Sequence, residues 1–469
     1  MSDLSARIRA IVRERRRQDD PVRPRAAGDS RAVDPDRAAA CLGGRVVETA
    51  AGHCVVIDRL YRSGQRYGNA CVSDYAVRHG HATRLLSGGG AAPSGPGRAD
   101  PDRVVFVDLE TTGLSGGAGT CAFLVGCGHF VDAGFQTRQF FLPGLSQEPA
   151  LLDQVFSYVR QAASVVTFNG KSFDVPMLEN RWAFHRMRAT LDDMHHLDML
   201  HPARRLWRRP PTREARSAAV GTMPRHDGSR ESCSLQTLER LLLGVVREGD
   251  PGGWEIPSLY FHYVRSGDAE RLEPVLEHNR LDLISLAGLT ARAIRLVDQG
   301  PTEAASALEC LGLGRLYERL GRHESAMRCY GDAVGLSAEL GLAAGPPMRF
   351  GSAAEPEVRC DALRRLARGL RRQRRYADAA LVWQRLVEAG PTRVARLEAL
   401  EALAVHHEHR TRELDVAKRL ATQAMAAPHE PGRGRRLEHR LARLDRKLDG
   451  VASAAPTSLP LRGTSSGGR

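Results

Sequence analysis

Two acidic residues end an apolar run, and their spacing is suited to binding a metal ion. The run starts at Val104, and Asp108 and Glu110 follow within the segment VDLETTG. Because side chains alternate faces along a strand, the two carboxylates share a face and can bind one hard cation. Two acids at the end of a buried strand are costly unless something compensates their charge. The alternative is a strand terminus with solvated acids, since this spacing also occurs by chance.

A second acidic motif, TFNGKSFD, leads from a short strand through a polar turn to Asp174. Asp174 stands where a helix begins, so an N-cap is the simplest interpretation. Lys171 argues against that interpretation. The chain has 68 basic residues, of which only Lys171, Lys418 and Lys447 are lysine, and one of the three lies beside this acid. A compact ammonium at this place is suited to meeting a phosphate.

The third motif, EHNRLD, carries His278 and Asp282 at the start of a long helical pattern. Residues four apart share one face of a helix, so the two side chains lie one turn from each other. A lone histidine on a helix is more often structural than catalytic. The functional interpretation depends on the combination, because three acidic motifs in order each stand at the end or start of an element that faces a common sheet edge.

The elements that position these motifs alternate between strands and helices. Residues 103–141 predict a meander of three strands, and a helix, a short strand and a second helix follow. The predicted fold class is therefore an α/β domain with a central mixed sheet flanked by helices, followed by an all-α region. From Cys310 to Ala333, and again around Trp383, small and large residues follow the pattern of a tetratricopeptide helix pair. A third, poorer copy places Ala417, Ala421 and Ala424 on one helical face.

Composition changes along the chain give the domain boundaries. The predicted segments are a disordered basic segment at 1–43, a β-hairpin extension at 44–85 that packs on the α/β domain, a linker at 86–102, the α/β domain at 103–298 with a mobile insertion at 208–230, helical repeats at 302–449 and a disordered tail at 450–469. A chain ending near Gln299 is expected to stay folded.

The overall composition predicts a cytoplasmic protein. Hydrophobic residues make up 42% of the chain, and no run reaches the roughly 18 apolar residues that a membrane span requires. Nine cysteines, an odd number without CxxC pairs, are typical of reduced thiols. The net charge of +13 suits a polyanionic partner. It is explained equally well by a general bias toward arginine.

The motifs resemble those of the YprB-type ribonuclease H-like proteins within the DnaQ-like, DEDD exonuclease superfamily. The resemblance covers residues 44–297, extends into the helical region, and rests on the segments DLETTGL, TFNGKSFDVPML, LDMLHPARRLW, WEIPSLY and HNRLDLISL. It implies two divalent cations, Mg²⁺ or Mn²⁺, held by Asp108, Glu110, Asp174 and Asp282. It also implies that His278 takes a proton from the attacking water, and that the protein is a 3′-5′ exonuclease acting on RNA or single-stranded DNA.

This chemistry suits a phosphodiester, because two cations about 4 Å apart can activate a water and stabilise the departing oxygen. The step from His278 to Asp282 is four residues, whereas the histidine version of the superfamily commonly has five, which leaves the role of His278 open. The residues predicted to contact substrate are Thr111, Thr112, Asn169, Lys171, Phe173 and Asn279.

Further residues are assigned less specific roles. Asp198 is expected to orient its neighbours or the substrate. Arg204, Arg205 and the insertion that follows either contact the phosphate backbone or form a solvated basic face. The rival hypothesis is a non-catalytic scaffold in which the repeats bind a protein partner or nucleic acid and the nuclease fold is inactive.

Overall fold

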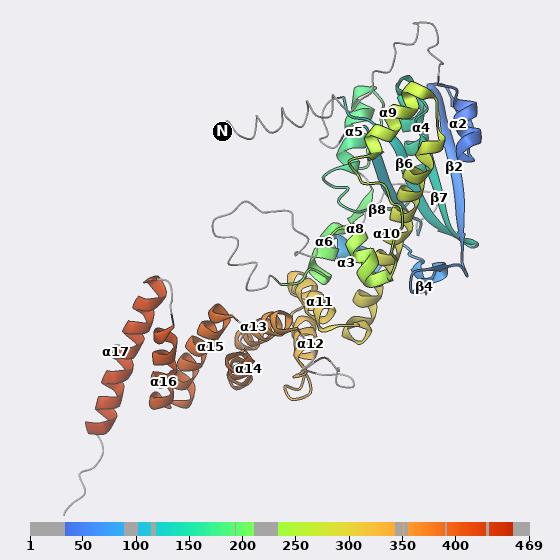
Figure 1. Cartoon of the computed structure of the whole chain (residues 1–469). Helices are drawn as coiled ribbons and strands as arrows, with labels where there is room; N and C mark the ends of the chain where they lie inside the picture. The colour runs from blue at the N-terminus through green and yellow to red at the C-terminus, as the bar shows by residue number, and fades with distance from the viewer. Residues whose placement is uncertain are drawn as a thin grey trace, which may run out of the picture.

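A seven-stranded mixed sheet forms the centre of the first part of the chain (Figure 1). The computed structural model describes residues 33–88, 102–113, 119–192, 194–210, 233–342, 350, 355–389, 392–427 and 431–453. The strands are β1 (Arg45–Thr49), β2 (Gly52–Arg62), β5 (Val104–Thr111), β6 (Ala122–Val131), β7 (Gly134–Phe141), β8 (Ser164–Thr167) and β9 (His195–Asp198). Their order in the sheet is β1-β2-β7-β6-β5-β8-β9.

The sheet confirms the predicted meander and the mixed topology. Strands β5, β6 and β7 pair antiparallel, and β8 and β9 continue the sheet in parallel from β5. The expected hairpin at the N-terminal side is corrected in one respect. Strands β1 and β2 do not pack on the α/β domain as a separate extension, because β2 pairs with β7 over eight residue pairs and extends the same sheet. A small second sheet holds β3 (Arg66–Tyr67) and β4 (Ala70–Cys71).

Helices cover both faces of the sheet. One buried core joins alternate residues of β5, such as Val105 and Val107, to α2 (Pro35–Leu42), α4 (Glu148–Val159), α5 (Asp174–Phe184) and α9 (Ile256–Ser266). The other joins Val104 and Phe106 to α3 (His81–Ser87), α6 (Leu200–Leu206), α8 (Leu235–Leu238) and most of α10 (Glu273–Gln299). This alternation along β5 is what the apolar run predicts for a strand buried on both faces.

Only the edges of the predicted disordered, linker and insertion segments lie among the residues that the structure describes. Helix α2 lies within the segment 1–43, so order starts earlier than predicted, with Asp34 Oδ1 accepting hydrogen bonds from the first turn. The insertion at 208–230 and the linker at 86–102 fall almost entirely outside the described residues. The last helix continues to Ser453, four residues into the predicted tail.

The second part of the chain is all-helical, as predicted. Its helices are α11 (Ala307–Arg319), α12 (His323–Val334), α13 (Pro356–Arg372), α14 (Tyr376–Ala389), α15 (Arg393–His406), α16 (Leu414–Ala426) and α17 (Pro431–Ser453). They pack in chain order and extend away from the sheet (Figure 1). Ala417, Ala421 and Ala424, which are predicted to share one helical face, are all fully buried on α16.

The two parts share a core. Helix α11 packs on α6 so closely that a Cβ at Gly312 would lie 2.3 Å from the carbonyl oxygen of Leu206. The indole of Trp207 donates to Glu309 Oε1 at 3.1 Å. The buried cluster on this face of the sheet continues without a break into α11, α12 and α13. No helix in the described ranges is long and apolar enough to span a membrane.

Candidate active site

Helix α10 crosses the sheet directly over the first acidic motif. Asp108 on β5, Gly126 on β6 and Gln139 on β7 are neighbours across the three strands. Asn279 of α10 lies over Gly126, where a Cβ would come within 2.1 Å of its Oδ1 atom. Only glycine allows this approach, because any other residue would place its Cβ inside the asparagine side chain.

Asn279 links these strands through its amide. Its Nδ2 atom donates to Asp108 Oδ2 at 2.8 Å and to the Asp108 carbonyl at 3.2 Å, and its Oδ1 atom accepts from Gln139 Nε2 at 2.8 Å. The side chain is completely buried. The prediction that Asn279 contacts substrate is therefore corrected: it lies beneath the site and positions Asp108.

Asp174 lies at the first position of α5, and a tight turn delivers it there. Asn169 adopts a left-handed φ of 70°, and a Cβ on Gly170 would lie 2.7 Å from Asp174 Oδ2. Buried Asp198 fixes the turn by accepting from the backbone amides of Asn169 at 2.8 Å and Lys171 at 3.1 Å. Asp198 therefore orients its neighbours, one of the two roles that the sequence predicts for it.

His278 faces two of the predicted metal ligands. Its Nε2 atom lies 3.8 Å from Glu110 Oε1 and 3.6 Å from Asp282 Oδ2. Its Nδ1 atom lies 2.7 Å from Asp250 Oδ1. The three side chains, Glu110, His278 and Asp282, are each about one tenth exposed, with values of 12%, 11% and 15%. Two acidic motifs far apart in the sequence therefore meet at one histidine.

Arg247 forms a second contact with Asp282, and no pattern in the sequence predicts it. Its Nη2 atom lies 2.5 Å from Asp282 Oδ1 and 2.5 Å from Glu239 Oε2. Burial opposes the charged form of Arg247, but the hydrogen bonds to Glu239 and the charge of Asp282 raise its pKa overall. Ser285 donates to the same carboxylate of Glu239. Arg247 is thus a fixed positive charge at the edge of an acidic site.

The carboxylates of the three motifs repel one another. Burial raises the pKa of Asp108 well above its usual range, and the charges of Asp282, Glu110 and Asp174 raise it further, although the hydrogen bond from Asn279 lowers it. Burial also raises the pKa of Glu110 well above its usual range, and the charges of Asp282, Asp174 and Asp250 raise it further. Burial also raises the pKa of Asp174 to about 7. Acidic groups are therefore crowded at this end of β5, and burial and their mutual repulsion favour the protonated forms.

The donor set fits a hard divalent cation, but the side chains are not arranged as a finished cage. Across the described ranges, no three His, Cys, Asp or Glu side chains converge closely enough to enclose a metal ion as they stand. Asp282 Oδ1 is buried, and the guanidinium of Arg247 lies 2.5 Å from it. A divalent cation at this oxygen would therefore compete with Arg247.

The other predicted substrate contacts lie in the loops around these acids. Lys171 and Phe173 are exposed, and Phe173 keeps 60% of its surface accessible. Thr111 Oγ1 donates to the Gly113 carbonyl, and Thr112 Oγ1 accepts from the amide of Cys121, so both hydroxyls hold the end of β5. Arg204 is exposed and Arg205 half-buried on α6.

Comparison with known proteins now defines the class of the first part. Residues 105–294 match the family described as the RNase_H superfamily. The chain therefore carries an RNase H superfamily domain, and the matched residues include Asp108, Glu110, Asp174 and Asp282.

The chain is similar to YprB of Bacillus subtilis (strain 168). The two are 29% identical over 352 residues, which span 74% of this chain and 75% of YprB. Among solved structures, the family B DNA polymerase of the hyperthermophilic archaeon Pyrobaculum calidifontis matches with a TM-score of 0.30 and 13% identity, over 64% of this chain and 44% of the polymerase.

Sequence reasoning missed three residues of this site. Glu239, Arg247 and Asp250 all come from the segment between α8 and α9, which carries no recognisable motif. The one available signal was the concentration of charge in VREGD, which directly follows an apolar stretch.

Proposed function

We propose that the chain is a metal-dependent nuclease that hydrolyses phosphodiester bonds of nucleic acid, of the 3′-5′ exonuclease class. Asp108, Glu110, Asp174 and Asp282 would hold two Mg²⁺ or Mn²⁺ ions. When bound, such ions supply an activated water and stabilise the charge on the departing oxygen. The observation that carries the proposal is that Glu110 and Asp282, from motifs far apart in the sequence, both lie within 4 Å of His278 Nε2, at 3.8 Å and 3.6 Å.

The chain's own residues would perform the remaining steps. His278 Nε2, 3.8 Å from Glu110 and 3.6 Å from Asp282, would accept a proton from the attacking water, and Asp250, 2.7 Å from Nδ1, would fix the orientation of the ring. Lys171 and Phe173 project from the turn before α5 and would contact a phosphate and a base. Asn279 would keep Asp108 in one rotamer.

The test is cleavage of end-labelled single- and double-stranded RNA and DNA, free or blocked at either end, with Mg²⁺, Mn²⁺ or chelator. We expect metal-dependent release of nucleotides from free 3′ ends, and its loss in Asp108→Asn. The matched control is Asp192→Asn, at an exposed aspartate outside the site. Equal cleavage by wild type and Asp108→Asn would show that the activity does not come from this site.

A non-catalytic scaffold is the second candidate, and the Arg247–Asp282 ion pair is the observation that favours it. A permanent arginine could replace the cation that the site would otherwise bind. Calorimetric titration with Mn²⁺ separates the two. Binding that is weakened in Asp108→Asn supports the nuclease, whereas heat changes identical in wild type and Asp108→Asn support the scaffold.

A further inference from the structure

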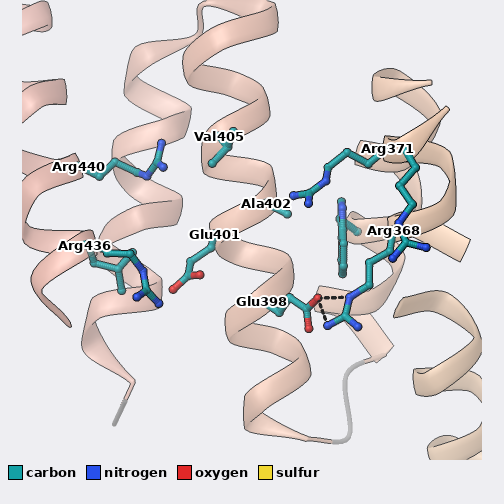
Figure 2. A pocket seen from close by; sticks show the side chains of 11 residues that line it. Arg368, Arg371, Glu398, Glu401, Ala402, Val405, Arg436 and Arg440 are labelled. Atoms are coloured by element: carbon teal, nitrogen blue, oxygen red, sulfur yellow. Dashed lines mark hydrogen bonds and ion pairs between the residues drawn. The ribbon is translucent and has the colours of Figure 1, made fainter. Parts of the chain in front are cut away.

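The helical region contains a cavity of about 400 Å³ between α13, α15 and α17. Figure 2 shows arginines on two sides of it, Arg368 and Arg371 from α13 and Arg436 and Arg440 from α17, with α15 between them. In Figure 1 these helices lie at the end of the chain that extends away from the sheet. The cavity is therefore separate from the candidate active site.

Most charges around the cavity already have partners within the protein. Glu398 of α15 is paired with Arg364 at 2.7 Å and with Arg368 at 2.6 Å. Glu401 is paired with Arg433 at 2.8 Å. The acids on α15 are thus neutralised from within the helical region.

Two arginines of the cavity differ from the rest. Arg371 and Arg436 are exposed and have no ion-pair or hydrogen-bond partner among the residues that the structure describes. They come from opposite sides of the cavity (Figure 2). An anionic group held between them would face two guanidinium groups that meet no competing carboxylate.

Apart from Arg372, which pairs with Glu318 at 3.6 Å, the remaining lining is apolar. Val405 is 39% exposed, Ala402 is half-buried, and Trp383 is only 3% exposed. Single-stranded nucleic acids depend on exposed aromatic faces on which bases can stack. Because the one aromatic side chain here is buried, the cavity suits an aliphatic side chain next to an acid better than it suits a nucleotide.

We infer that this cavity binds an acidic peptide segment of a partner protein, in which carboxylates flank an aliphatic side chain. Three long segments outside the described residues are poor occupants by charge. Residues 1–32 and 211–232 contain more arginine than acid, and residues 454–469 contain no acid. We therefore assign the acidic segment to a partner protein. This inference does not depend on nuclease activity.

The test measures binding of a fluorescein-labelled nonapeptide, three repeats of Glu-Leu-Asp, to the full chain by fluorescence anisotropy. Binding should be lost when Gln and Asn replace its acids, and should weaken about tenfold or more in a double variant of Arg371→Glu and Arg436→Glu. The matched control is the double variant of Arg396→Glu and Arg419→Glu, at exposed arginines of α15 and α16 outside the cavity. It makes the same change in net charge and should bind within about twofold of wild type.

Three results would overturn the inference. One is the absence of nonapeptide binding by the wild type at about 1 mM protein. Another is equal weakening in the two double variants, which would indicate only a general effect of net charge. The third is that the protein binds a labelled nine-nucleotide oligouridine more tightly than it binds the peptide, and that the double variant of Arg371 and Arg436 loses this oligouridine binding. That result would make the cavity a nucleic-acid site. Thermal unfolding of each variant checks that the helices remain folded.

Discussion

Arg247 joins Asp282 to Glu239, with its Nη2 atom 2.5 Å from a carboxylate oxygen of each. The side chains of Arg247 and Glu239 are only 6% and 2% exposed. A buried charge is tolerated only when it is paired, so each of these groups depends on the other. The arginine therefore stabilises the fold while it competes with any cation for Asp282.

We expect Arg247→Met to lower the free energy of unfolding by about 3–5 kcal/mol at neutral pH, because it leaves Glu239 and Asp282 without a countercharge. Mn²⁺ should then stabilise the variant more than the wild type, since Asp282 is freed. Chemical denaturation with Mn²⁺ or with chelator measures both effects. Arg240→Met, at an exposed arginine of the same segment, is the control and should change little. An equal Mn²⁺ effect in wild type and Arg247→Met would mean that Arg247 does not compete with the metal.

Asp174 predicts how stability depends on pH when metal is removed. Burial raises its pKa from 3.8 to about 7 in the folded protein. A raised carboxylate pKa means that the folded state holds its proton more tightly, so this contribution is complete below about pH 4 and is lost as the pH rises through about 7. We expect Asp174→Asn to flatten that part of the curve and to stabilise the chelated protein at pH 8 by about 2–4 kcal/mol.

The measurement is denaturant unfolding with chelator between about pH 4 and pH 8. Asp192→Asn serves as the control for the loss of one exposed carboxylate. If wild type and Asp174→Asn show the same slope against pH, Asp174 is not protonated in the folded protein and the electrostatic argument for the site fails.

The His278–Asp250 pair predicts a division of roles in catalysis. His278→Ala should lower turnover at neutral pH by about a hundredfold and leave Mn²⁺ affinity nearly unchanged, because the histidine is not a predicted ligand. Asp250→Asn should cost less, about tenfold, and should shift the pH profile, because it changes the partner of Nδ1 rather than the base itself. His262→Ala on α9 is the control. Rates for His278→Ala that equal wild type from pH 6 to 9 would remove His278 from the mechanism.

The sequence predicted what local patterns determine. The alternation of buried residues along β5 follows from near neighbours in the chain, so the strands and the acidic motifs could be located, although the turn before Asp174 also depends on distant Asp198. The contact of Asn279 with Asp108 could not, because it depends on the register that places Gly126 and Gln139 beside Asp108. A glycine within an apolar strand gives no sign of the helix that crosses it.

Arg247, Glu239 and Asp250 were missed for a related reason. They reach the site from a segment without a motif, and only the packing of that segment against α10 brings them there. Likewise, the apolar pattern of β1 and β2 identifies two strands but not the pairing of β2 with β7, because pairing between distant strands is set by the whole core.

Glu309 joins the two parts of the chain and predicts that they are not independent. It is 2% exposed and accepts from Trp207 Nε1 at 3.1 Å and from Arg292 Nη2 at 2.6 Å. The expectation that a chain ending near Gln299 stays folded is therefore revised, because truncation would remove this carboxylate and expose the core around α6 and α10.

We expect the chain truncated at Gln299 to be insoluble or to unfold at a much lower temperature than the full chain. In the full chain, Glu309→Ala should lower the free energy of unfolding by about 3–5 kcal/mol, because it removes the carboxylate shared by Arg292 and the buried Trp207 indole and leaves Arg292 only its contacts with Glu303. Glu324→Ala, at an exposed position of α12, should change it by less than about 0.5 kcal/mol. A truncated protein that melts at the temperature of the full chain would show that the RNase H superfamily domain folds alone and that the Glu309 contacts only orient the helical region.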